Sequence, residues 1–66
     1  MSEQVVVRIL RLPAVMDRVG LRRARIYELE SEGHFPKRVK VSNHAVGWIE
    51  SEITAWLQAR INASRA

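Results

Sequence analysis

The chain contains no cysteine, so neither a disulfide nor a cysteine-based zinc site can reinforce its fold. Its longest unbroken apolar runs are three residues, such as Val5-Val6-Val7, whereas a membrane-spanning helix needs roughly 20. The first residues also lack the basic start and apolar stretch of a secretion signal. We therefore expect a cytoplasmic protein with no membrane partner. At 66 residues the chain has room for one domain with a thin core.

Patterns of catalytic and metal sites are missing as well. The sequence has no glycine-rich phosphate loop and no recognisable Ser-His-Asp or paired-carboxylate motif. His34 and His44 stand ten residues apart without the further ligands that a metal site requires. We expect no enzymatic activity, no metal and no cofactor.

Two short helices joined by a tight turn are predicted at 13–19 and 23–32. Apolar residues recur with helical spacing at Leu12, Val15, Met16 and Val19, and then at Ile26 and Leu29. Gly20 interrupts the pattern, and Gly33 suits a left-handed cap at the end of the second helix. A helical hairpin whose second helix opens with clustered arginines is typical of a helix-turn-helix, in which that helix enters the major groove of DNA.

The remaining segments predict a sheet and a third helix. Residues 4–10 are rich in valine and predict either a strand or an extended arm. Residues 39–46 predict a small β-hairpin, or wing, with its tip at 42–45. A helix at 50–63 carries an apolar stripe that we expect to be buried, formed by Ile49, Ile53, Trp56, Leu57 and Ile61. Trp48 and Phe35 are expected to close the core, and residues 63–66 to fray. The predicted fold is one mainly α winged helix-turn-helix domain over 1–66.

Positive charge is concentrated in the middle of the chain. The net charge is +4, and residues 21–44 hold six basic against three acidic side chains. This localisation is typical of a surface that binds a polyanion such as double-stranded DNA. Charge alone leaves a solvated basic surface as an equal alternative.

Helical geometry directs four residues of the second helix away from the core, namely Arg23, Ala24, Tyr27 and Glu28, whereas Arg22 and Arg25 lie at its entrance and on one flank. Arg23 is the candidate for a bidentate contact with guanine, and Arg22 and Arg25 are candidate phosphate contacts. Glu28 either accepts from a cytosine amino group or pairs with Arg25, and Tyr27 either bonds a phosphate or packs against the wing. The full set of candidates on this helix is Arg22, Arg23, Ala24, Arg25, Tyr27 and Glu28.

The wing supplies a second group of candidate DNA contacts. Lys40 alternates away from Val39 and Val41, which predicts that Lys40 faces solvent. Asn43 and His44 lie at the tip. With the residues at the base of the wing, the set is Lys37, Arg38, Lys40, Asn43 and His44.

The order and spacing of many short motifs resemble the AlpA family of prophage regulators. These motifs include Leu12-Pro13-Ala14-Val15, Gly20-Leu21, Gly33-x-Phe35-Pro36, Val46-Gly47-Trp48 and Trp56-Leu57. The resemblance covers about residues 9–60 and implies a winged helix-turn-helix similar to those of MerR-type and excisionase-type proteins. The chain departs from the family's usual residues at Arg22, Arg25, Glu28 and Glu30, so a relative's operator sequence is not transferable.

The resemblance implies a sequence-specific transcriptional regulator of a prophage or integrative element that controls integrase expression. Two alternatives remain open. One is an excisionase that bends DNA at attachment sites, and the other is a small adaptor that uses the valine-rich arm on a partner sheet. The expected partners are double-stranded DNA, neighbouring copies of the chain on DNA, and an integrase.

Overall fold

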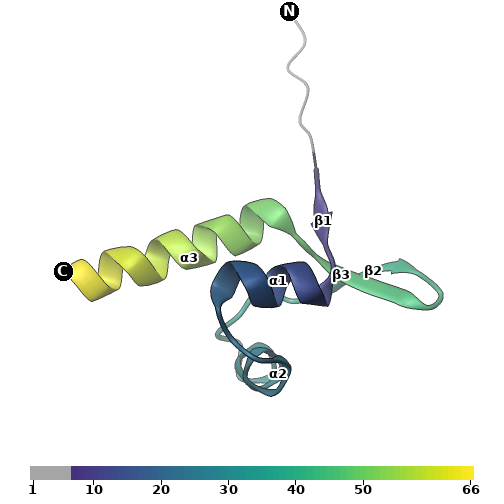
Figure 1. Cartoon of the computed structure of the whole chain (residues 1–66), viewed down its shortest axis with the longest axis horizontal. Helices are drawn as coiled ribbons and strands as arrows, with labels where there is room; N and C mark the ends of the chain where they lie inside the picture. Colours follow the sequence, from purple (N-terminus) through teal and green to yellow (C-terminus); the bar gives the residue numbers. More distant parts are fainter. Residues whose placement is uncertain (1–6) are drawn as a thin grey trace, which may run out of the picture.

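Helices and a small sheet make up the part of the chain that the computed structural model describes, residues 7–66 (Figure 1). The elements in chain order are β1 (Ile9–Leu10), α1 (Leu12–Val19), α2 (Arg23–Ser31), β2 (Val39–Ser42), β3 (Ala45–Ile49) and α3 (Glu50–Arg65). In Figure 1, α3 and the β2–β3 hairpin extend in opposite directions from α1, and α2 is seen nearly end-on below them. The predicted mainly helical fold with a β-hairpin is confirmed.

Two glycines with positive φ follow the ends of α1 and α2. Gly20 has a φ of 71° and donates its N–H to the carbonyl of Met16, which ends α1. Gly33 has a φ of 80°, and the N–H groups of Gly33 and His34 bond to the carbonyls of Glu30 and Leu29. This pair of bonds is a Schellman motif, which confirms the left-handed cap predicted at Gly33.

The sheet is antiparallel, with the strand order β1-β3-β2. Ile9 and Leu10 pair with Ile49 and Trp48, so the end of the predicted N-terminal segment forms a strand. Residues 4–6 of that segment lie outside the described residues. β2 pairs with β3 through an irregularity between Lys40 and Ser42.

Six buried side chains from across the chain form the core: Val15, Ile26, Leu29, Phe35, Trp48 and Ile53. Trp48 is fully buried, and its indole N–H donates to the carbonyl of Pro36 at 3.1 Å. One face of each helix therefore packs against the hairpin and the loop that precedes it. The core positions predicted at Ile26, Leu29, Phe35 and Trp48 are confirmed.

Three expectations about packing need correction. Ile61 is 41% exposed, because the last turns of α3 extend beyond the elements that cover its first turns. Trp56 is only half-buried at the edge of the core, where its ring meets Phe35 edge to face with centroids 4.8 Å apart. Val41 is 52% exposed, since the bulge in β2 breaks the simple alternation with Lys40. The structure also continues α3 to Arg65, two residues beyond the predicted end.

Gly47 allows β1 to approach β3 closely. A Cβ atom at this position would collide with the side chain of Ile9 and lie 2.9 Å from the carbonyl oxygen of Leu10. We expect Gly47→Ala to lower the free energy of unfolding by about 1–3 kcal/mol, because the backbone of β1 would have to shift. Urea denaturation would measure the loss. The exposed neighbour Val46 provides the control: Val46→Thr should stay within about 0.5 kcal/mol of the parent. Equal stabilities for the two variants would contradict this account of Gly47.

Candidate nucleic-acid interface

The N-terminal end of α2 presents exposed positive charge. Arg22 precedes the helix in an extended conformation with φ −84° and ψ 162°, and its side chain makes no capping hydrogen bond. The N–H groups of the first turn therefore lack a side-chain cap, because an arginine side chain has no oxygen to accept them. Arg22 and Arg23 are both exposed, and neither lies within 4.0 Å of a carboxylate among residues 7–66. Their charges add to the partial positive charge of the helix terminus.

Arg25 is paired within its own helix. Its guanidinium contacts the carboxylate of Glu28 one turn later, and both side chains are more than half exposed. Of the two alternatives for Glu28, the described structure contains the pairing with Arg25. An exposed pair of this kind is worth at most about 1 kcal/mol, so a phosphate or a base can compete for either partner. Ala24 is also exposed, and its small side chain leaves the neighbouring arginines unobstructed.

A polar cluster joins α2 to the beginning of β2. Glu30 accepts the backbone N–H of Arg38 at 2.7 Å, and its other carboxylate oxygen lies 3.3 Å from Nε of Arg38. The guanidinium of Arg38 also stacks over the ring of Tyr27, 4.9 Å from the ring centroid. The Tyr27 ring therefore packs against the base of the wing. The cluster fixes where the hairpin starts relative to α2.

Glu30 is the residue that sequence reasoning missed. Its signal in the sequence was its place among the departures from the family pattern that the chain resembles. The Glu30 side chain is 10% exposed, and its partner Arg38 lies eight residues further along the chain. Such a pairing depends on the turn after α2, which periodicity does not reveal. Because Glu30 neutralises Arg38, that arginine is a weaker candidate for DNA than its sequence position predicted.

The Glu30 cluster gives a stability prediction. Glu30→Ala should lower the free energy of unfolding by about 1–3 kcal/mol, because it removes the acceptor for both the N–H and the guanidinium of Arg38. Glu32→Ala is the matched control, since Glu32 is exposed and has no ion pair within residues 7–66. Urea denaturation followed by tryptophan fluorescence would compare the two variants. If they are equally stable, the cluster does not hold the wing.

The remaining candidates are exposed along the hairpin and before it. Lys37 and Lys40 have no carboxylate within 4.0 Å in the described chain, and Lys40 faces solvent as predicted. Asn43 and His44 form the turn between β2 and β3. A shallow pocket of about 320 Å³ lies between α2 and the base of the wing, lined by Glu30, Ser31, Lys37 and Arg38. Basic and polar groups therefore occupy both α2 and the hairpin.

Two features are absent from residues 7–66. No group of three or more His, Cys, Asp or Glu side chains lies close enough together to hold a metal ion. None of the described helices combines the length and apolar character needed to cross a membrane.

The helical hairpin, the wing and the packing of α3 define a winged helix-turn-helix protein. A family model described as "Prophage CP4-57 regulatory protein (AlpA)" matches residues 8–61. The chain belongs to this family of prophage regulatory proteins, and the resemblance seen in the sequence is confirmed.

Two curated proteins are similar to the chain over most of its length. It is 48% identical over 54 residues to the "Uncharacterized protein ORF88" of Enterobacteria phage P4, covering 82% of this chain and 61% of that protein. It is 42% identical over 66 residues to the "DNA-binding transcriptional activator AlpA" of Escherichia coli (strain K12), covering 91% of this chain and 94% of that protein. The chain thus spans less than two thirds of ORF88 but nearly the whole of AlpA.

Proposed function

We propose that this protein binds double-stranded DNA in a sequence-specific manner, with the N-terminal end of α2 in the major groove. The proposal rests mainly on Arg22 and Arg23, which lie at a helix terminus that has no side-chain cap. Both side chains are exposed, and neither has a carboxylate partner among residues 7–66. Guanidinium groups suit both phosphates and the O6/N7 edge of guanine. The printed name of the AlpA relative, a DNA-binding transcriptional activator, adds support.

Within this proposal the residues of α2 have different roles. Arg23 reads a guanine, and Arg22 holds a phosphate beside the helix terminus. Arg25 reaches a phosphate by exchanging its contact with Glu28, and the hydroxyl of Tyr27 bonds a phosphate while its ring stays against Arg38. Ala24 lets the helix approach the bases closely.

The wing contacts the neighbouring backbone or minor groove. Lys40 and Lys37 supply charge, and Asn43 and His44 supply polar groups at the tip. Arg38 contributes through the position of the wing, since Glu30 already holds it. These contacts contribute more to the affinity for DNA than to its sequence specificity.

We further propose that the protein regulates transcription in a prophage or integrative element and acts on integrase expression. The regulatory family and the activator among its relatives favour this role over an excisionase. A single module of this size buries about 600–1,000 Å² on DNA, which limits its specificity. We therefore propose that the free protein is monomeric and that several copies bind adjacent sites on DNA.

A gel-shift experiment with DNA from upstream of the protein's own operon tests the proposal, with random DNA of equal length as the control. We expect a specific complex whose affinity falls steeply as salt rises, because phosphate contacts release counterions. Equal affinity for the two fragments would contradict sequence-specific binding. Footprinting should show adjacent protected sites, and ultracentrifugation should show a monomer without DNA. A tight dimer in free solution would contradict the proposed assembly.

A further inference from the structure

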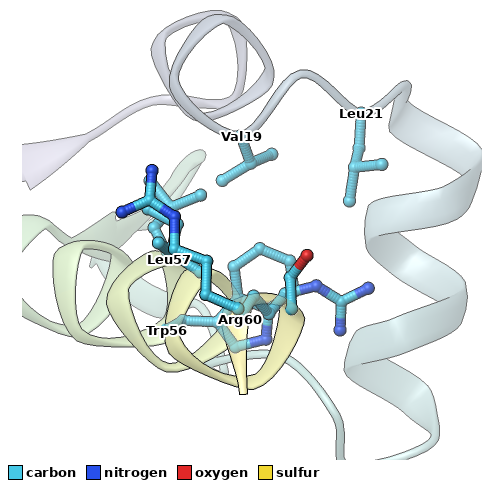
Figure 2. Close-up of a pocket in the computed structure, with 8 residues that line it drawn as sticks. Val19, Leu21, Trp56, Leu57 and Arg60 are labelled. Atoms are coloured by element: carbon cyan, nitrogen blue, oxygen red, sulfur yellow. The ribbon is translucent and has the colours of Figure 1, made fainter.

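An apolar groove opens between the α1–α2 turn and the C-terminal half of α3. Figure 2 shows the side chains of Val19 and Leu21 pointing toward α3 from one side of it. The groove has a volume of about 480 Å³, and its apolar walls are formed by Val19, Leu21, Trp56, Leu57 and Ile61. None of these residues belongs to the candidate DNA-binding set.

The groove exists because only the first half of α3 is covered. Ile53 is fully buried, and Arg18 of α1 donates to the hydroxyl of Thr54 at 3.1 Å. Residues 58–65 of α3 are all exposed, including Ile61 at 41%. The apolar stripe therefore continues past the end of the core. Ile61 and its apolar neighbours in the groove therefore form a surface that the rest of residues 7–66 does not cover.

The edge of the groove is positively charged. Arg60 and Arg65 line it, and the sequence has no acidic residue after Glu52. Arg60 stacks over the Trp56 ring at 4.6 Å, and neither arginine has a carboxylate within 4.0 Å among residues 7–66. Two copies docked through this same face would bring these like charges together. An acidic partner would complement them.

We propose that this groove docks an acidic amphipathic segment of a partner protein. Its apolar side chains would fill the space between Leu21 and Ile61, and its Asp or Glu residues would pair with Arg60 and Arg65. This is the mode in which an amphipathic helix lies in an apolar groove. The apolar walls favour a protein over DNA as the occupant, because a sugar-phosphate backbone has no apolar side chains to fill the space between them. The surface goes beyond the proposed function, since α2 and the wing remain free to bind DNA.

A panel of synthetic helical peptides tests the proposal. Three fluorescently labelled peptides share Leu at positions i, i+3, i+4 and i+7 and differ only in carrying Glu, Lys or Gln beside them. Fluorescence anisotropy with the full chain should show the Glu peptide binding about tenfold more tightly than the Lys peptide. The double variant Arg60→Glu, Arg65→Glu should reverse this order. Ile61→Ser should weaken binding of the Glu peptide by about tenfold, since it removes an apolar wall without changing the charge.

Matched measurements separate this proposal from its alternatives. Urea denaturation checks that the variants fold, which is expected because all three substituted residues are exposed. The proposal is overturned if the anisotropy curves do not saturate, or if the three peptides bind with equal affinity. A dimer of the free chain that Ile61→Ser abolishes would assign the groove to a second copy instead. Gel shifts with the same samples should show unchanged DNA affinity in Ile61→Ser, because that substitution leaves the net charge of the chain as it is. A loss of DNA affinity in this variant would place the groove in the DNA interface and also overturn the proposal.

Discussion

Replacing Trp48 by alanine is expected to unfold the protein. Trp48 is fully buried between the hairpin and the helices, and its indole N–H satisfies the carbonyl of Pro36. Truncating a buried tryptophan costs about 3–5 kcal/mol. A chain of this length has a total stability of only about 3–10 kcal/mol, at roughly 0.05–0.15 kcal/mol per residue. Circular dichroism during urea titration should show a strongly destabilised or unfolded Trp48→Ala variant.

Trp56→Ala is the control for this experiment. Trp56 was expected in the core, but it is half-buried at the edge, and its indole N–H donates to the carbonyl of His34 at 2.7 Å in an exposed position. We expect Trp56→Ala to retain a cooperative transition at a lower urea concentration than the parent. If the two variants lose equal stability, the greater burial of Trp48 does not determine how much each tryptophan contributes to the free energy of unfolding.

Arg23→Ala and Lys40→Ala are expected to change DNA binding in different ways. If Arg23 contacts a guanine, its loss should cost about 1–3 kcal/mol on the specific site and reduce discrimination against other sites. If Lys40 contacts a phosphate, its loss should weaken all DNA about equally and lower the salt slope by about one. Both side chains are exposed, so neither change should affect folding.

Titrations of specific and random DNA at several salt concentrations would distinguish these outcomes. Glu52→Ala serves as a control for removing an exposed charge, since Glu52 lies on α3 outside the candidate interface. Equal losses on specific and random DNA for Arg23→Ala would refute its role in reading a base. A site-dependent loss for Lys40→Ala would refute a pure phosphate contact.

Local sequence patterns predicted most of the fold. Apolar spacing identified α1 and α2, and Gly33 was recognised as a left-handed cap because its chemistry is local. Alternation at 39–41 and the predicted tip at 42–45 identified the hairpin. Helical geometry also placed the arginines of α2 on the outer surface, since Ile26 and Leu29 fix the buried side. These features depend on residues within one or two turns of one another.

Contacts between distant segments account for the features that those patterns leave open. The spacing of Ile61 continues the stripe of α3, but its exposure depends on where α1 and the α1–α2 turn stop covering that helix. The pairing of Glu30 with Arg38 depends on how the chain returns after Pro36. The helices, the hairpin and the outward position of the arginines thus follow from local sequence patterns, because periodicity and capping act over a few residues. Which apolar residues stay exposed and which charges are neutralised follow from packing, because both depend on contacts between distant segments.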